Sequence, residues 1–241
     1  MGNEGITTKQ GCFDDSTLFS RENQESMPRV LTPEILDELP PDDPAAIRSR
    51  RDLQRINSVM GNYRWIARQM VNHAELVNHW IELGAGDGGL ARHVSNIPVT
   101  GLDFAPRPAV WPKNWDWKSG DLFQTLPNLA DKSETIGVIA NLFLHHFTDE
   151  QLEILGDLLG EKTAVLIFSE PTRHWIHQAQ GVLAHPFINH VTKHDMRVSI
   201  EAGFRGAELA ETMRLSRNFE VVKTSHQFFG AYRVVAKRLR S

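Results

Sequence analysis

The stretch WIELGAGDGGLARHV, residues Trp80–Val94, decides the fold that this chain adopts. Its first four residues fit a buried strand, and its last apolar residues predict a helix over 88–95. Four glycines lie between the two: Gly84, Gly86, Gly88 and Gly89. A strand, a glycine turn and a helix in succession present free backbone N–H groups to a ligand that approaches closely. The stretch therefore predicts a ligand site at the end of a strand.

The glycine turn fits two ligand classes. Gly84, Gly86 and Gly89 satisfy the G-x-G-x-x-G pattern of dinucleotide sites. Glu82, followed by Gly84, Gly86 and Gly88, satisfies the acidic-x-G-x-G-x-G pattern of S-adenosylmethionine sites. The glycine turn alone does not distinguish the two ligand classes. The residues that follow it in the chain are needed for that choice.

Three polar residues come at or just after the ends of later predicted strands: Asp103, Asp121 and Asn141. A carboxylate at the position of Asp103 can accept hydrogen bonds from both hydroxyls of a ribose, which suits either ligand. Asp121 follows the next strand, where its carboxylate can accept from an adenine amino group. The alternative interpretation is that Asp121 is an ordinary surface-loop residue without a ligand.

Short apolar segments alternate with amphipathic ones from about residue 63 onward. The predicted strands are 79–83, 97–103, 115–119, 135–141, 163–169, 219–227 and 230–238. The predicted helices are 63–76, 88–95, 149–160, 173–184, 193–203 and 206–214. This alternation favours an α/β fold, a doubly wound, mostly parallel sheet with helices on both faces. The last two strands are too close for a crossover and are expected to form an antiparallel hairpin.

The order of these landmarks resembles the class I S-adenosylmethionine-dependent methyltransferases, in particular the small-molecule group of type 11 and type 12. The resemblance covers about residues 60–241 and includes the closing hairpin. It implies a Rossmann-like sheet of seven strands, with S-adenosylmethionine as cofactor and S-adenosylhomocysteine as product. The implied cofactor-binding residues are Glu82, Gly84, Ala85, Gly86, Gly88, Asp103, Phe104, Asp121, Leu122 and Asn141.

Several other classes lack their residues in this chain. The Tyr-x-x-x-Lys pair of short-chain dehydrogenases is absent, because neither Tyr63 nor Tyr232 has a lysine at that spacing. Asn141 is not followed by the two prolines common in base amino-methyltransferases, and no aspartate cluster suggests the metal-dependent catechol type. We therefore expect a small-molecule acceptor, most often a hydroxyl of an aromatic, quinone-like or polyketide-like compound. An RNA or protein methyltransferase and an NAD(P)-binding oxidoreductase stay open as alternatives.

Two adjacent histidines, His145 and His146, follow the fourth predicted strand. Their stretch resembles a segment of small-molecule O-methyltransferases whose first histidine is the general base, which would be His145. A neutral imidazole can take a phenolic proton during methyl transfer. Adjacent side chains of an extended backbone point to opposite sides, so one histidine is expected to line the pocket while the other supports the loop. Structural roles for both, and a base role for His146, stay open.

The acceptor is expected to lie beside the fifth strand and the segment after it. We predict contacts from Tyr63, Arg64, Glu170, His174 and Trp175. The spacing His174-x-x-His177 suggests a metal site, but no cysteine or close carboxylate supports it, so none is predicted.

The remaining sequence sets the domain limits and the setting. Residues 1–30 are polar and predict a flexible tail, 31–62 a helical extension or lid, and 63–241 the methyltransferase domain. In the extension, Asp43 and Pro44 mark a helix start. A net charge of −4 disfavours nucleic acid, although a solvated arginine face between Arg48 and Arg55 is a possible anion surface. No membrane span is expected, and a single cysteine fits a cytoplasmic protein, a monomer or a homodimer.

Overall fold

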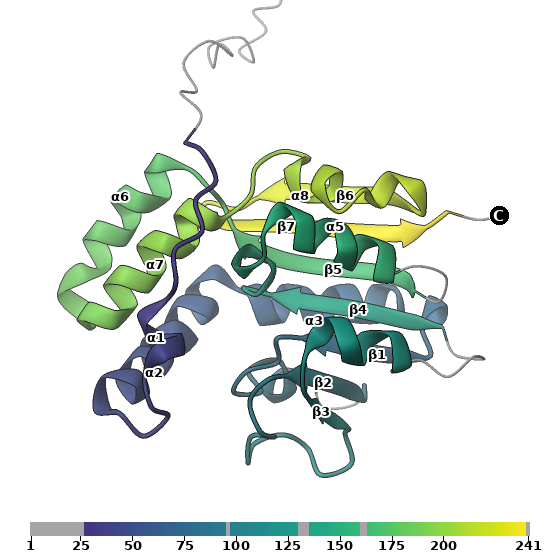
Figure 1. The fold of residues 1–241 in the computed structure, drawn as a ribbon, viewed down its shortest axis with the longest axis horizontal. Coiled ribbons are helices and arrows are strands. Elements are labelled where there is room, and N and C mark those ends of the chain that lie inside the picture. Colours follow the sequence, from purple (N-terminus) through teal and green to yellow (C-terminus); the bar gives the residue numbers. More distant parts are fainter. Residues whose placement is uncertain (1–26, 95–96, 130–134, 160–162, 240–241) are drawn as a thin grey trace, which may run out of the picture.

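A computed structural model describes residues 27–94, 97–129, 135–159 and 163–239, and they form one seven-stranded sheet with helices on both faces (Figure 1). The strand order is β3-β2-β1-β4-β5-β7-β6. The strands are β1 His79–Leu83, β2 Val99–Asp103, β3 Trp117–Ser119, β4 Ile136–Asn141, β5 Thr163–Pro171, β6 Phe219–His226 and β7 Ala231–Arg238. All seven predicted strands are confirmed.

The first five strands run parallel, so their carboxyl ends meet at one edge of the sheet. β7 pairs antiparallel with both β5 and β6, which confirms the predicted closing hairpin. Gly84, Asp103 and Asn141 therefore lie along the same edge, because each comes at or just after the carboxyl end of a parallel strand.

The helices are α1 Ile35–Glu38, α2 Pro44–Met60, α3 Asn62–Asn72, α4 Leu122–Thr125, α5 Asp149–Leu158, α6 Trp175–Ala184, α7 His190–Ala202 and α8 Glu208–Thr212. Side chains from α5 and α8 pack on one face of the sheet, and α3 packs on the other. Strand residues alternate between the two faces: Ile81 and Leu83 join the α5 face, whereas Trp80 joins the α3 face. By the same period, Glu82 and Asn141 belong to the α3 face.

Four helices gather beyond the carboxyl ends of β4 and β5, where α1, α2 and α6 all contact α7 (Figure 1). Asp43 caps α2 as predicted, accepting from the backbone N–H groups of Ala45 and Ala46. The side of α2 that packs on α7 is polar: Ser49 receives a hydrogen bond from the Thr192 hydroxyl at 2.9 Å. This group corresponds to the predicted extension together with the segment after β5.

One predicted helix is absent and another begins three residues earlier than predicted. In place of the helix over 88–95 there is a single 3-10 turn, Leu90–Arg92, within the described residues. Gly88 stands in the left-handed region with φ +75°, and closely spaced glycines oppose helix propagation. The helix expected from 193 begins at His190, because the Asn189 side chain caps it by accepting from the backbone N–H of Thr192.

Only the last residues of the predicted tail, 1–30, are described by the structure. Residues 1–26 lie outside the described residues, but residues 27–30 pack on the domain. The Arg29 guanidinium donates to the carbonyl oxygens of His145, Phe147 and Ala202, and it forms an ion pair with Asp149 at 2.6 Å. These contacts hold the segment before α1 against the turn that carries the two histidines.

Candidate cofactor and acceptor site

The glycine turn after β1 is shaped by left-handed backbone and by close packing. Gly84 has φ +64° and Gly86 has φ +52°, a region that side chains rarely adopt. A Cβ atom on Gly84 would lie 2.1 Å from Cδ2 of Phe143, so this ring packs directly on the glycine backbone. The turn is also tied to β2, because the Gly84 N–H donates to the carbonyl of Leu102 at 2.9 Å.

Asp103, at the end of β2, joins this turn to the neighbouring loop. One carboxylate oxygen accepts from the backbone N–H of Gly86 and the other from that of Ala105, both at 2.8 Å. Asp103 is half-buried, and the adjacent Phe104 ring is 77% exposed, an unusual position for a large apolar side chain. A carboxylate beside an open aromatic ring suits a ribose and its base.

Asp121 and Leu122 have local structural roles after β3. The Asp121 carboxylate caps α4 by accepting from the backbone N–H groups of Phe123 and Gln124, both at the same oxygen. Leu122 and Ala85 are buried in the two halves of the core, so their side chains are not open to a ligand. Their predicted cofactor contacts stay predictions that would have to come from the backbone.

Glu82 and Asn141 carry buried oxygens without hydrogen-bond partners. Oε2 of Glu82 and Oδ1 of Asn141 are both in this state, on neighbouring strands and on the α3 face of the sheet. Burial, and then the charges of Asp87 and Asp103, raises the pKa of the Glu82 carboxyl well above its usual range. Such orphaned acceptors are costly unless a ligand donates to them. The residues at this edge therefore fit a cationic ligand with amino groups.

Tyr63 and Asn57 cover this position from the junction of α2 and α3. A Cβ atom on Gly89 would lie 2.1 Å from the Tyr63 hydroxyl, so the phenol packs against the glycine turn. Its ring stacks on His93, with centroids 5.0 Å apart. The Asn57 side chain accepts from the amide of Asn141 at 3.2 Å. The extension thus contacts the carboxyl edge of β4.

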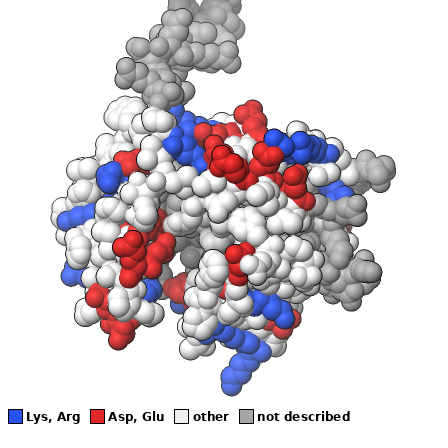
Figure 2. Space-filling view, viewed as in Figure 1, with Lys and Arg blue, Asp and Glu red and all other residues white. Residues whose placement is uncertain are grey.

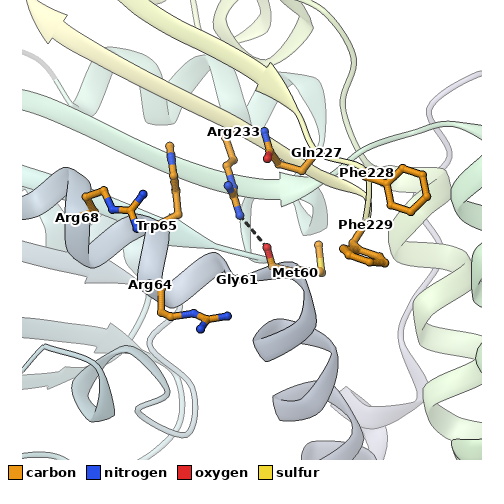
Figure 3. A pocket seen from close by; sticks show the side chains of 9 residues that line it. All are labelled: Met60, Gly61, Arg64, Trp65, Arg68, Gln227, Phe228, Phe229 and Arg233. Carbon is orange, nitrogen blue, oxygen red and sulfur yellow. Dashed lines mark hydrogen bonds between the residues drawn. The ribbon is translucent and has the colours of Figure 1, made fainter.

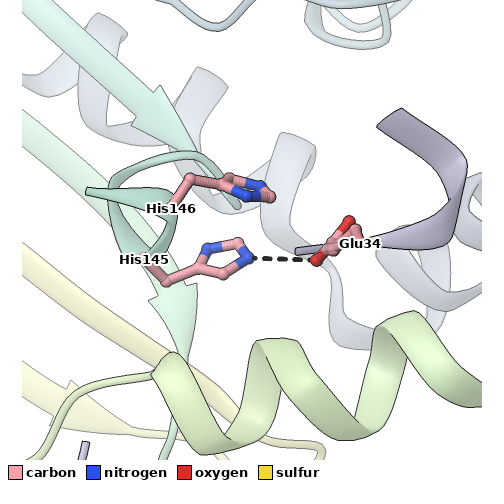
Figure 4. A group of neighbouring side chains, drawn as sticks. All are labelled: Glu34, His145 and His146. Atoms are coloured by element: carbon pink, nitrogen blue, oxygen red, sulfur yellow. Dashed lines mark ion pairs between the residues drawn. The ribbon is translucent and has the colours of Figure 1, made fainter. Parts of the chain in front are cut away.

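The two histidines lie in a single 3-10 turn, Leu144–His146, and not on extended backbone. The expected opposite orientation of their side chains is therefore wrong: the rings lie side by side, with centroids 4.2 Å apart (Figure 4). Glu170, at the end of β5, is fully buried beneath the turn and accepts from the backbone N–H groups of Phe143, Leu144 and His145. This carboxylate holds the turn in place rather than lining a cavity.

His145 is buried between two carboxylates. Its Nδ1 lies 2.8 Å from the Glu170 carboxylate and its Nε2 lies 3.6 Å from that of Glu34. Burial lowers the pKa of His145, but the two carboxylates outweigh it and raise the pKa to about 9. Desolvation, and then the charge of His145, lowers the pKa of His146 to about 4. The two carboxylates thus favour a proton on His145, and that charge disfavours a proton on the neighbouring His146.

A cavity of about 360 Å³ adjoins the histidine pair. It lies between the N-terminal segment and α7, and His146 is exposed at its wall. The cavity is lined by Leu31, Thr32, Pro33, Glu34, Asp37, His145, His146, Val198, Ser199 and Ala202. Its wall combines apolar groups with imidazoles and carboxylates, which suits a partly apolar molecule with a polar reacting group.

A second cavity, of about 400 Å³, lies between α3 and the β6–β7 hairpin (Figure 3). Arg64 lines it together with Trp65 and Arg233, and Arg233 donates to the carbonyl of Met60 at 2.7 Å. Neither His174 nor Trp175 lines either cavity: His174 caps α6, and the Trp175 side chain is 66% exposed. The structure thus divides the predicted acceptor contacts between separate places.

On the face that Figure 2 shows, basic and acidic side chains are interspersed, and acidic ones gather over α1 and α2.

Within the described residues, no helix has both the length and the apolar character that a bilayer crossing requires.

Sequence reasoning missed Glu34, Arg29 and Asn57. Each reaches the site from far along the chain: Arg29 and Glu34 meet His145 from more than a hundred residues away. No local pattern marks these contacts. The density of carboxylates between Glu34 and Asp43 was the one sequence signal that set this segment apart.

Known structures share this architecture. No protein-family model and no curated protein matches the chain. The plantazolicin methyltransferase BamL, solved with a triazolic desmethylPZN analog and SAH, superposes with a TM-score of 0.62 at 8% identity, over 84% of this chain and 92% of that one. A SAM-dependent methyltransferase from Anabaena variabilis gives 0.53 at 15% identity, over 89% and 99%.

The pyocyanin biosynthetic protein PhzM gives a TM-score of 0.54 at 15% identity, over 82% of this chain and 60% of that one. Likenesses at such low identity establish architecture. The sheet order, the closing hairpin and these superpositions agree, so the chain has the Rossmann-like fold of the class I S-adenosylmethionine-dependent methyltransferases.

Proposed function

We propose that this chain transfers a methyl group from S-adenosylmethionine to a small-molecule acceptor, with a hydroxyl as the favoured acceptor group. The observation that carries the proposal is the pair of unpartnered buried oxygens, on Glu82 and Asn141, beside the left-handed glycine turn. When bound, S-adenosylmethionine supplies an electrophilic methyl group on a sulfonium. The buried Glu82 carboxylate would accept from its ammonium group, and Asp103 would accept from its ribose hydroxyls.

The cavity beside His146 is the proposed acceptor site. The turn that carries both histidines begins three residues after Asn141, so it borders the proposed cofactor edge. Apolar side chains such as Leu31 and Val198 would pack on the acceptor, while the imidazoles and the Glu34 carboxylate face its reacting group. The acceptor hydroxyl would pass its proton to this cluster of imidazoles and carboxylate as its oxygen takes the methyl group. The chain would otherwise supply mainly positioning and exclusion of water.

The lid role of the extension is part of the proposal. Tyr63 and Asn57 contact the glycine turn and Asn141, while Arg29 fastens the N-terminal segment over the histidine turn. We propose that Tyr63 and Arg64 contact the cofactor or the acceptor from the α3 side. A cytoplasmic location, and a monomer or homodimer, stay predictions.

Product analysis tests this function. The full chain is incubated with methyl-labelled S-adenosylmethionine and a panel of hydroxylated aromatic and quinol compounds, and products are separated by liquid chromatography and mass spectrometry. The expected product carries the label on oxygen. A labelled amine, RNA or protein in its place would contradict the acceptor class, and failure to bind S-adenosylmethionine would contradict the function.

A further inference from the structure

Three side chains meet at the wall of the acceptor cavity with ligand atoms within 4.8 Å of one another: Glu34, His145 and His146 (Figure 4). Glu34 comes from the start of α1, and the histidines come from the turn after β4. Two imidazoles and one carboxylate are the donor set of many catalytic zinc and non-haem iron sites. Figure 4 shows both rings turned toward the carboxylate.

The orientation of His145 is fixed by its second nitrogen. Nδ1 lies 2.8 Å from the Glu170 carboxylate, and in metal sites such a hydrogen bond leaves Nε2 as the ligand atom. Here Nε2 is buried and has no hydrogen-bond partner, and its contact with the Glu34 carboxylate is an ion-pair contact at 3.6 Å. A buried ring nitrogen that faces a carboxylate without a hydrogen bond to it is rare in proteins.

The distances suit a shared ion. Nε2 of His145 and Oε1 of Glu34 are 3.6 Å apart, too far for a hydrogen bond. Two ligands that each lie about 2.1 Å from a zinc ion at a near-tetrahedral angle are separated by roughly that distance. Glu34 is also held in place, because the Ser199 hydroxyl donates a hydrogen bond to the same oxygen. Such outer contacts are typical of metal ligands.

The electrostatic setting favours a cation. Five carboxylate residues fall within the segment from Glu34 to Asp43, and acidic side chains gather over α1 and α2 in Figure 2. Asp37 lines the same cavity.

We propose that Glu34, His145 and His146 bind one divalent transition-metal ion, with Zn²⁺ as the favoured ion. Its remaining coordination positions would face the cavity of about 360 Å³, where an acceptor hydroxyl would bind, become more acidic on the ion and release its proton to solvent in place of the histidine pair. This inference rests on the proposed function for the acceptor and goes beyond it: it narrows the acceptor to molecules with a metal-binding oxygen, such as a phenolate or an adjacent hydroxyl–carbonyl pair. The metal-binding part stands on the geometry alone.

Metal binding is measured without any cofactor or acceptor. The full chain is freed of metal with a chelator, and Zn²⁺ binding is followed by titration calorimetry, with Co²⁺ as an absorbing probe of the ligand geometry. We expect one equivalent bound per chain. Glu34→Gln and His146→Ala are expected to weaken binding at least tenfold, the usual effect of losing one ligand or its support.

Matched controls separate the site from adventitious histidine binding. Glu38→Gln and His190→Ala change exposed residues of the same two types and are expected to bind metal as the unmodified chain does. Far-ultraviolet circular dichroism checks that each variant folds. Absence of a stoichiometric site, or equal affinity in the site and control variants, would overturn the proposal. Because no cofactor is present, either result is independent of whether S-adenosylmethionine binds.

Discussion

The proposed cofactor edge and the proposed acceptor side of this molecule are built in different ways. The cofactor edge, formed by the ends of β1, β2 and β4, uses residues that follow their strands directly, such as Gly84 and Asp103. The acceptor side joins the histidine turn to Arg29 and Glu34, which reach it from the N-terminal segment. The first is set by local backbone geometry, whereas the second depends on contacts between distant parts of the chain. A substitution in one region should therefore leave the function of the other region unchanged.

The largest effect is expected from Gly84→Ala. Its backbone is left-handed, and the new Cβ would lie 2.1 Å from Phe143. Strain and overpacking together should lower the free energy of unfolding by roughly 2–5 kcal/mol, measured in urea. Gly206→Ala is the matched control, with φ +47° and nothing within 4 Å, and should cost only about 1 kcal/mol. Equal losses would show that Phe143 does not pack on the turn.

Arg29→Ala tests the acceptor side. The guanidinium is 8% exposed, donates to three backbone carbonyls and lies 4.8 Å above the Phe204 ring. Its removal should lower the free energy of unfolding by about 2–3 kcal/mol, since buried acceptors lose charged donors. Stabilisation by S-adenosylmethionine should persist, whereas turnover should fall. Arg48→Ala, at an exposed position, is the control, and loss of cofactor binding in Arg29→Ala would erase the distinction between the regions.

Asp103→Asn should act only at the cofactor edge. The amide keeps the size of the carboxylate but loses its charge and one acceptor oxygen. We expect S-adenosylmethionine to bind about tenfold more weakly, a change of about 1.4 kcal/mol in binding free energy. Zn²⁺ binding should be unchanged. Asp116→Asn, an exposed aspartate just before β3, serves as control in the same calorimetric titration.

Glu82→Gln should produce the smallest effect and one of opposite sign. Burial raises the pKa of Glu82 in the folded state, so ionisation of this side chain opposes folding. The stability that the neutral form provides is therefore lost as pH rises through that pKa. The glutamine variant should melt roughly 2–4 °C higher at neutral pH, as about 1 kcal/mol does at this size. The gap should close at acidic pH, and cofactor affinity should fall. A lower melting temperature at neutral pH would contradict the raised pKa of Glu82.

The same difference explains what the sequence could predict. All seven strands and the closing hairpin follow from local patterns, because period and composition within five to nine residues determine them. The helix after the glycine turn was wrong, since Gly88 and its neighbours favour turns over helix. The predicted start of α7 at 193 was wrong because the Asn189 side chain caps the helix by accepting from the backbone N–H of Thr192.

In the candidate site, too, residues set by local backbone geometry were predictable from the sequence, and residues set by long-range contacts were not. The glycine turn and Asp103 were predictable, because strand ends fix where such residues lie. The orientation of His145 and His146 was not, because a 3-10 turn held by Glu170 replaces extended backbone. Glu34 could not be assigned, because only the tertiary fold brings α1 to the histidines.

The central claim, binding of S-adenosylmethionine at the carboxyl edge, is tested most directly by thermal unfolding. The full chain is melted with S-adenosylmethionine, S-adenosylhomocysteine, NAD or NADP, each in large excess. A ligand at about 100 times its dissociation constant stabilises by about 2.7 kcal/mol, which should raise the melting temperature by roughly 5–10 °C. We expect this rise with the two sulfur compounds alone. A rise with NAD or NADP only would contradict the account and return the glycine turn to the dinucleotide class.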